Sequence, residues 1–269
     1  MIRILEQVLF PGAPVLALLV GVIIGSFLWA TACRWGIHRA FHLSERSRCP
    51  ECGKQLRWFE LIPVLSYVMQ RGRCRHCRKA MGPAYIWAEV LVAFVFAAIV
   101  ATFGVSLQTV GLVLIASVLM LLAFIDARTG YLPDALTIPT ALCLATGLAY
   151  LGWMNSIEVS PFAFSAFNYW LWGGVVGTGF IGLLVALTSG KGMGLGDVKL
   201  MLPIGFSLGG PLTIVALGVA FIVGAAVGVA LIATGRATRK TALPFGPFLV
   251  LGWFVAGIWG STFLSLVLY

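Results

Sequence analysis

Residues 170–187 read WLWGGVVGTGFIGLLVAL and contain no charged side chain. A run of this length and composition is long enough to cross the hydrocarbon core of a bilayer as a helix. Residues 192–199, GMGLGDVK, follow it, and there glycines and Asp197 interrupt the apolar sequence before another apolar run begins. This alternation of long apolar runs with short polar breaks extends along the chain and decides the fold.

The composition agrees with a membrane protein. The 269 residues are 60% hydrophobic and 10% charged, against about 25% charged in ordinary soluble domains. No β-barrel alternation is present in the sequence, and helices satisfy their own backbone hydrogen bonds in lipid. We therefore expect an all-α polytopic membrane protein. The predicted spans are 8–32, 85–103, 107–125, 135–153, 170–187, 212–233 and 245–269, with a shorter apolar piece at 198–208.

The first apolar run, 8–32, is interpreted as a retained helix rather than a signal peptide. Ala30-Thr31-Ala32 resembles a small-residue cleavage site. However, the run is longer than the core of a signal peptide, which usually has about 7–15 residues. A dense basic block also follows the run instead of preceding it.

The basic residues predict the orientation of the chain. More than half of the 18 Lys and Arg residues lie between Arg34 and Lys79, where the acidic residues are only Glu45, Glu51 and Glu60. Cytosolic loops of membrane proteins carry an excess of Lys and Arg, so this segment is expected in the cytosol and the N-terminus outside.

The same rule predicts how the second half of the chain crosses the membrane. The basic residues at 236–240 must also be cytosolic, so the stretch 198–234 must cross an even number of times. Gly209-Gly210-Pro211 at its middle is a turn signal, so the stretch is predicted to be a helical hairpin. About eight transmembrane helices result, with both termini outside. The piece 198–208 rises only about 17 Å, so we expect it to be tilted, extended or re-entrant.

Two cysteine pairs form a recognisable metal-binding pattern. Cys49 and Cys52 form one C-x2-C pair, Cys74 and Cys77 form another, and a spacer of about 20 residues separates them. Thiolate pairs at this spacing bind a tetrahedral metal, usually zinc. Two disulfides are the alternative, but a cytosolic segment lies in a reducing compartment. The charge of the segment could also bind nucleic acid; membrane topology already explains that charge, so we expect no nucleic-acid partner.

Two carboxylates are expected to do chemistry. Asp126 and Asp197 each stand at the cytosolic edge of a membrane-length apolar run, where an ionisable group is a candidate for function. If the two side chains meet, they cannot both ionise, so one stays protonated while the other remains a base. This is the arrangement of an aspartic protease, in which the base activates water and the acid polarises the scissile carbonyl.

Residues around the carboxylates have less specific signals. Gly194 and Gly196, with Gly192, would let backbone approach a peptide substrate and permit positive φ. Lys199 could lower a carboxylate pKa or extend towards lipid headgroups. Asp134 competes with Asp126 as the first carboxylate, although its position fits the start of the fourth helix. The plain alternative for Asp197 is a helix-capping residue in an ordinary loop.

Several motifs, in order along the chain, resemble the type IV prepilin peptidase family. They are Gly25-Ser26-Phe27-Leu28, the segment 48–89 with both cysteine pairs, Leu132-Pro133-Asp134 after Asp126, the stretch 194–199, and Leu243-Pro244-Phe245-Gly246-Pro247-Phe248. Any one motif could arise by chance, whereas the ordered set is specific. At position 29, where the family usually has Asn, this chain has Trp29.

The resemblance implies a function and a set of roles. Members of the family are bacterial inner-membrane aspartic endopeptidases that cleave the basic leader of prepilins and pseudopilins in type IV pilus and type II secretion systems. Many then methylate the new N-terminus with S-adenosylmethionine. By this resemblance Asp126 and Asp197 are the catalytic pair, and Cys49, Cys52 and the second cysteine pair bind zinc. The expected domains are a first transmembrane helix at 8–32, a cytosolic zinc module at 33–84 and a seven-helix peptidase core at 85–269.

Two other classes of protein remain as alternatives. A secondary transporter could place Asp126 and Asp197 in a membrane cavity as an ion or proton site, although such sites are expected near the midplane of the bilayer. A metal-dependent membrane sensor would explain the cysteines and leave the paired acids without a role.

Overall fold

The computed structural model describes residues 12–38, 47–49, 51–157, 162–190, 192–238 and 241–268. The chain forms two compact units, Met1–Phe124 and Ile125–Tyr269, and the division falls near the end of one long helix. The described residues contain no β-strand; their extended pairing is limited to two isolated bridges, Arg48 with Gln55 and Arg73 with Ala80.

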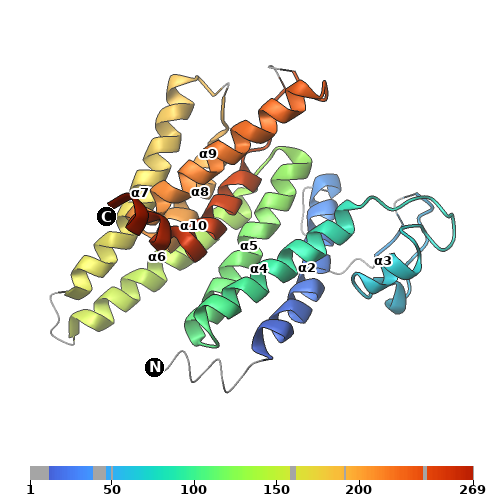
Figure 1. Ribbon diagram of the computed structural model, residues 1–269, viewed down its shortest axis with the longest axis horizontal. Helices are drawn as coiled ribbons and strands as arrows, with labels where there is room; N and C mark the ends of the chain where they lie inside the picture. The colour runs from blue at the N-terminus through green and yellow to red at the C-terminus, as the bar shows by residue number, and fades with distance from the viewer. Residues whose placement is uncertain are drawn as a thin grey trace. The chain divides into compact units, whose positions relative to one another are not determined.

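Long helices account for most of the described chain (Figure 1). In order they are α2 (Ala13–His38), α4 (Ala84–Phe103), α5 (Leu107–Thr129), α6 (Asp134–Ile157), α7 (Phe162–Leu187), α8 (Leu195–Leu208), α9 (Gly210–Ala233) and α10 (Gly246–Leu268). Each predicted apolar run corresponds to one of these helices, so the all-α expectation is confirmed for the described residues. The first helix continues to His38, six residues past the predicted end, and residues 8–11 of that prediction lie outside the described part.

Among the described residues, five helical segments are long and apolar enough to cross a membrane. They are Ala13–Trp35, Ala84–Phe103, Leu107–Thr129, Trp170–Leu187 and Gly210–Ala233. The helix α8 has 14 residues and rises about 21 Å, less than the roughly 30 Å of a hydrocarbon core. The fold is that of a membrane protein, and the count of eight crossings stays a prediction.

In the first unit, α2 and α4 pack against each other through small residues. A Cβ on Gly21 would lie 2.6 Å from Cα of Ala93, and a Cβ on Gly25 would lie 2.9 Å from Cα of Glu89. Backbones this close require glycine, as is common where membrane helices pack together. Trp29, on the same helix as these glycines, is buried and packs edge-on against Tyr85 at 6.0 Å between ring centroids.

Between α2 and α4 the chain forms a small module without long helices. It contains the 3-10 turn η1 (Trp58–Leu61), the short helix α3 (Leu65–Met69) and the four paired cysteines. Val64, between the two helical pieces, has a φ of 59°, which is strained for a β-branched residue.

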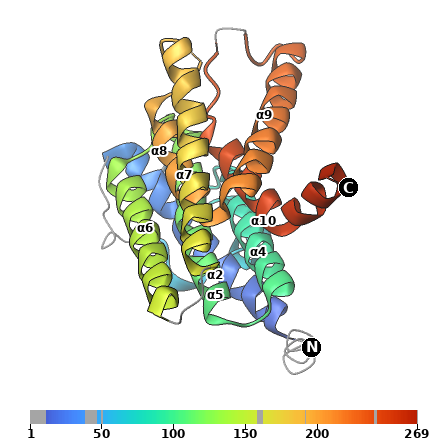
Figure 2. The ribbon, with the colours of Figure 1, turned by 90° about the vertical axis from the view of Figure 1, so that its left-hand side faces the viewer.

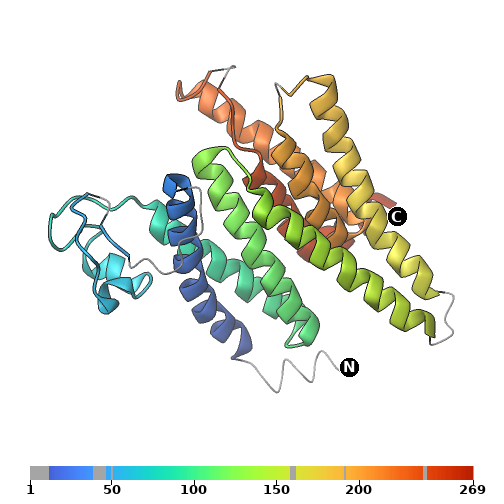
Figure 3. The same ribbon diagram turned by 180° about the vertical axis from the view of Figure 1, so that it is seen from behind.

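In the second unit, α8 lies against α7 at a contact made of glycines. A Cβ on Gly173 would approach the carbonyl oxygen of Gly205 to 2.3 Å, and a Cβ on Gly174 would approach the ring of Phe206 to 2.3 Å. The helix α6 also packs against both α7 and α8 (Figure 3).

The chain turns between α8 and α9 at Gly209, which has a φ of 79°. This is the predicted turn signal, and α9 begins at the next residue. Figure 2 shows the α7–α8 and α9–α10 connections at the same end of the second unit. The even number of membrane crossings along this stretch stays a prediction, since among its described residues only α9 has the length of a crossing.

Candidate functional site

Asp126 lies in the last turn of α5 and is buried, with 5% of its surface exposed. Its Oδ2 accepts a hydrogen bond of 2.9 Å from the backbone N–H of Gly246, the first residue of α10. A Cβ at position 246 would lie 2.7 Å from that oxygen, so only glycine leaves room for the carboxylate. The sequence motif that contains Gly246 indicates no role for it; the available signal is a glycine between Phe245 and Pro247 at the start of an apolar run.

Asp197 lies in the first turn of α8 and has 7% of its surface exposed. Its Oδ2 accepts a hydrogen bond of 3.1 Å from the backbone N–H of Gly194, the residue that precedes the helix. Asp197 is therefore a helix-capping residue, as the alternative interpretation predicts, because its side chain accepts a hydrogen bond from a backbone N–H at the start of α8. A residue that only capped would not need to be buried, and burying a carboxylate is costly.

Both predicted carboxylates are buried, one at the end of α5 and one at the start of α8. Both belong to the second unit, and the charge of Asp197 acts on Asp126 electrostatically. In each side chain Oδ2 is occupied by a backbone N–H, and Oδ1 has no protein hydrogen bond among the described residues. Two carboxyl groups that are each held from one side keep an oxygen that is available to a water molecule or a carbonyl group.

The glycines before Asp197 act differently from expectation. None of Gly192, Gly194 and Gly196 has a positive φ, so the predicted use of the left-handed region is wrong. Gly194 is extended, with a φ of −91°, and a Cβ there would meet nothing closer than 3.8 Å. Gly196 is needed for space, because its Cβ would lie 3.1 Å from Cβ of Leu132, in the connection between α5 and α6.

Lys199 is directed at Asp134. Its Nζ lies 2.7 and 2.8 Å from the two carboxylate oxygens of Asp134, and the side chains are 43% and 48% exposed. The described residues show no ion pair between Lys199 and either buried carboxylate. As expected, α6 begins at Asp134. Its exposure and ion pair distinguish this carboxylate from Asp126.

A second candidate site lies in the first unit, where the four paired cysteines converge. The Sγ atoms of Cys49, Cys52, Cys74 and Cys77 all lie within 4.8 Å of one another, and those of Cys49 and Cys77 are 3.9 Å apart. Zinc–sulfur bonds of about 2.3 Å place the sulfurs of a tetrahedral site about 3.8 Å apart. All six cysteines lie in the described residues, and none forms a disulfide. The donor set fits zinc.

The two cysteine pairs sit in knuckles with the same backbone hydrogen bonds. The carbonyl of the first cysteine accepts from the N–H four residues later, Gly53 in one knuckle and Arg78 in the other, each at 2.9 Å. The N–H of the first cysteine donates to the carbonyl five residues later, of Lys54 or Lys79, also at 2.9 Å. The residue four positions after the first cysteine has a positive φ in both knuckles, 66° for Gly53 and 56° for Arg78.

Backbone donors also favour the thiolate form of Cys74. The N–H groups of Cys77 and His76 point at its sulfur and lower the pKa of the thiol to about 7. In the same knuckle the backbone N–H of Lys79 lowers the pKa of Cys77, but burial and the neighbouring thiols outweigh it and raise that pKa to about 11. Since the thiolate is the form that binds a metal, the backbone favours the metal-binding form at Cys74 only.

Known proteins are similar to both halves of the chain. Residues 19–103 match the Bacterial Peptidase A24 N-terminal domain, and residues 113–229 match the Type IV leader peptidase family. The chain is 33% identical over 245 residues to a protein of Bacillus subtilis (strain 168) named prepilin leader peptidase/N-methyltransferase, covering 91% of this chain and 94% of the relative. Two proteins with the same name are similar. The one from Stutzerimonas stutzeri is 32% identical, with 91% and 90% covered, and the one from Neisseria gonorrhoeae is 31% identical, with 93% and 92% covered. No solved structure matches the chain.

Proposed function

Because the chain belongs to the type IV leader peptidase family, we propose that it removes the leaders of prepilins and pseudopilins as an aspartic endopeptidase, with Asp126 and Asp197 as the catalytic pair. One observation carries the choice of residues. Both carboxylates are buried in the second unit at the ends of helices, each is held by one backbone N–H, and the charge of Asp197 acts on Asp126.

The proposed reaction uses the two carboxyl groups as one unit that shares a proton. The ionised member removes a proton from a water molecule, whose oxygen attacks the scissile carbonyl carbon. The protonated member donates a hydrogen bond to the carbonyl oxygen and stabilises the charge that develops there. The tetrahedral intermediate then collapses, the C–N bond breaks, and the leaving amine takes the proton that the carboxyl pair had removed from water. The N–H groups of Gly246 and Gly194 hold the side chains in place, which lowers the cost of orienting them in each cycle.

The location of the reaction follows from the predicted topology. We place the chain in the bacterial inner membrane with eight crossings, both termini outside and the carboxylate pair at the cytosolic face. The prepilin leader is basic and cytosolic, and the rest of its N-terminal segment is an apolar helix in the lipid bilayer. Such a substrate would present its cleavage site at the membrane depth where α5 ends and α8 begins, which is where Asp126 and Asp197 lie.

The four cysteines are proposed to hold one structural zinc ion. The convergence of their sulfurs and the repeated knuckle hydrogen bonds support this role. Zinc would supply folding free energy to a module that has few other elements of regular structure.

Methyl transfer to the new N-terminus is proposed from the names of the relatives and the family resemblance. S-Adenosylmethionine would be the methyl donor, and the names and the resemblance are the whole support for this activity. No role in methyl transfer is therefore assigned to a residue. All the relatives named above carry peptidase names, and they give no support to the transporter alternative.

The direct test is incubation of the purified protein in detergent with a full-length prepilin. We expect two products whose masses correspond to the leader and to the mature pilin. A mature product heavier by one methyl group when S-adenosylmethionine is added would establish the second activity. An intact prepilin after incubation with folded, zinc-loaded protein would contradict the proposed function.

A further inference from the structure

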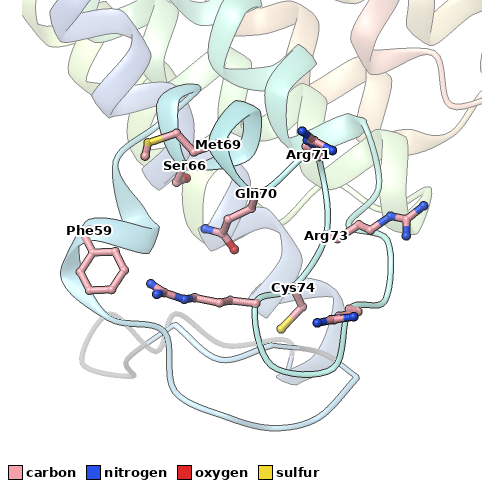
Figure 4. A pocket seen from close by; sticks show the side chains of 9 residues that line it. Phe59, Ser66, Met69, Gln70, Arg71, Arg73 and Cys74 are labelled. Atoms are coloured by element: carbon pink, nitrogen blue, oxygen red, sulfur yellow. The ribbon is translucent and has the colours of Figure 1, made fainter.

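A cavity of about 700 Å³ lies inside the cysteine module, in the first unit (Figure 4). Its lining includes four arginines, Arg71, Arg73, Arg75 and Arg78. In Figure 4, Phe59 lies on the side opposite Arg73. The volume is in the range of sites that hold a small organic molecule.

These arginines have no carboxylate partner among the described residues. Glu51 pairs with Lys79, Glu60 accepts the backbone N–H of Arg57, and Glu89 accepts that of Val64. Arg75 lies over the ring of Phe59 at 5.6 Å, a contact that leaves its N–H donors available. Guanidinium groups gathered around one cavity are the usual way in which proteins recognise phosphate.

The segment beside the cavity exposes an unusual amount of apolar surface. Trp58 is 78% exposed and Met69, which lines the cavity, is 75% exposed. The other exposed apolar residues between them are Leu61, Ile62, Leu65 and Val68. A row of this kind marks an interaction surface, and in a membrane protein an interfacial surface is one form of it.

A hydrogen bond places this segment at the depth of the bilayer surface. The backbone N–H of Val64 donates to Oε2 of Glu89 at 2.7 Å. Glu89 belongs to α4, whose membrane-crossing segment begins at Ala84. At 1.5 Å per residue, Glu89 lies only about 7–8 Å beyond the start of that span. Val64 and the exposed apolar residues on both sides of it are therefore held near the level of the lipid headgroups.

We propose that segment 58–69 inserts into the membrane surface and that the arginine cavity binds the phosphate headgroup of an anionic phospholipid from the same leaflet. The two features belong to one module, and the ligand chemistry matches both, since a phospholipid joins a phosphate to an apolar tail. The site would attach the cysteine module to the bilayer next to α4. This inference depends on α4 crossing a membrane and does not depend on the peptidase.

The experiment uses the full-length zinc-loaded protein in micelles with an equimolar mixture of phosphatidylglycerol and phosphatidylcholine. Native mass spectrometry counts the lipids retained by each variant. We expect the wild type to retain phosphatidylglycerol in preference to phosphatidylcholine. Because each arginine near a membrane contributes about fivefold to the binding of anionic lipid, Arg73→Gln with Arg75→Gln should weaken that preference about 30-fold.

The matched control removes two charges from the other knuckle, Arg48→Gln with Lys54→Gln, and should keep the wild-type preference. Zinc content equal to the wild type shows that each variant is folded. Equal retention of the two lipids by the wild type, or the same loss in the control pair, would overturn the proposal. Release of phosphatidylglycerol by millimolar inorganic phosphate would show a site for soluble anions instead.

Insertion of the segment has its own readout. Phosphatidylglycerol brominated near the carbonyl end of its acyl chains should quench part of the tryptophan fluorescence, and Trp58→Phe should remove that part. Lipid brominated near the terminal methyl group should not distinguish the two proteins. Identical quenching of wild type and Trp58→Phe by the first lipid would contradict insertion.

Discussion

The cysteine module takes all its ligands from residues 49–77, whereas the carboxylate pair takes its parts from the ends of α5, α8 and α10, far apart in the sequence. In the module, local hydrogen bonds shape each knuckle and a metal would join the two. In the pair, packed helices hold the carboxylates, and each accepts one backbone N–H, from the neighbouring Gly194 for Asp197 and from the distant Gly246 for Asp126. Metal loss should therefore destroy the first site and leave the second, and a change in helix packing should do the reverse.

Removal of one metal ligand is expected to have the largest effect on the module. Purified wild type should contain one zinc per chain, and Cys49→Ser or Cys74→Ser should lose it and unfold the module, because structural zinc supplies about 10–16 kcal/mol in small metal-dependent domains. Elemental analysis and limited proteolysis between α2 and α4 measure both effects. The helical core should keep its circular dichroism signal. Zinc-free wild-type protein, purified without chelator, would refute the metal site.

Gly246→Ala is expected to damage the carboxylate site and leave the cysteine module intact. The added methyl group would lie 2.7 Å from Oδ2 of Asp126, so the carboxylate must move. A displacement of about 1 Å at a catalytic group can cost about 100-fold in rate. Zinc content should be unchanged. Gly218→Ala is the matched control, since a Cβ on Gly218, in α9, meets nothing within 4 Å. Equal prepilin cleavage by the two variants would show that the Gly246 contact has no catalytic importance.

The two knuckles can be compared for the cost of backbone strain, an effect smaller than the loss of a metal ligand. Gly53 and Arg78 occupy equivalent positions with positive φ. Gly53→Ala should weaken zinc binding by about 1 kcal/mol, because an L-residue is strained there. Arg78→Gly relieves the same strain and should not weaken it. Competition with a chelating dye measures both affinities. Weaker zinc binding by Arg78→Gly than by Gly53→Ala would show that backbone strain at these positions does not limit the zinc affinity of the knuckles.

The exposed pair of Lys199 and Asp134 should matter least. Ion pairs with this much exposure contribute about 0–1 kcal/mol. Lys199→Gln should therefore shift thermal stability little and keep most of the peptidase activity. Asp134→Asn should also retain activity, because Asn suits a helix start about as well as Asp. Loss of cleavage in Lys199→Gln with unchanged stability would assign the lysine a role in substrate binding.

Sequence alone predicted more of the cysteine module than of the carboxylate site. Cys49, Cys52, Cys74 and Cys77 are close in sequence, so their spacing alone predicts that their sulfurs converge. A glycine at position 53 also indicates the positive φ of the first knuckle. The second knuckle has no such signal, because Arg78 adopts positive φ without being glycine. The helices were predicted because apolar runs near the length of a membrane crossing have few alternatives in lipid.

The parts that could not be predicted are contacts between distant segments. Nothing near Asp126 indicates that Gly246 donates to it, and nothing near Lys199 indicates that its partner is Asp134. The use of Gly196 for space beside Leu132, rather than for positive φ, depends on where the α5–α6 connection lies. The arginine cavity needed the fold of the module, because its lining residues are scattered between Phe59 and Arg78.

The central claim is that Asp126 and Asp197 act as one acid–base unit, and cleavage of a prepilin by four variants tests it most directly. Asp126→Asn and Asp197→Asn should each lower the cleavage rate by about 100-fold or more, since Asn keeps the shape but cannot exchange the proton. The double variant should be scarcely slower than either single one, because the two groups act together. Asp134→Asn is the control, and all four variants should keep wild-type zinc content and helicity. Near-normal cleavage by Asp197→Asn, or an inactive Asp134→Asn beside an active Asp126→Asn, would contradict this account.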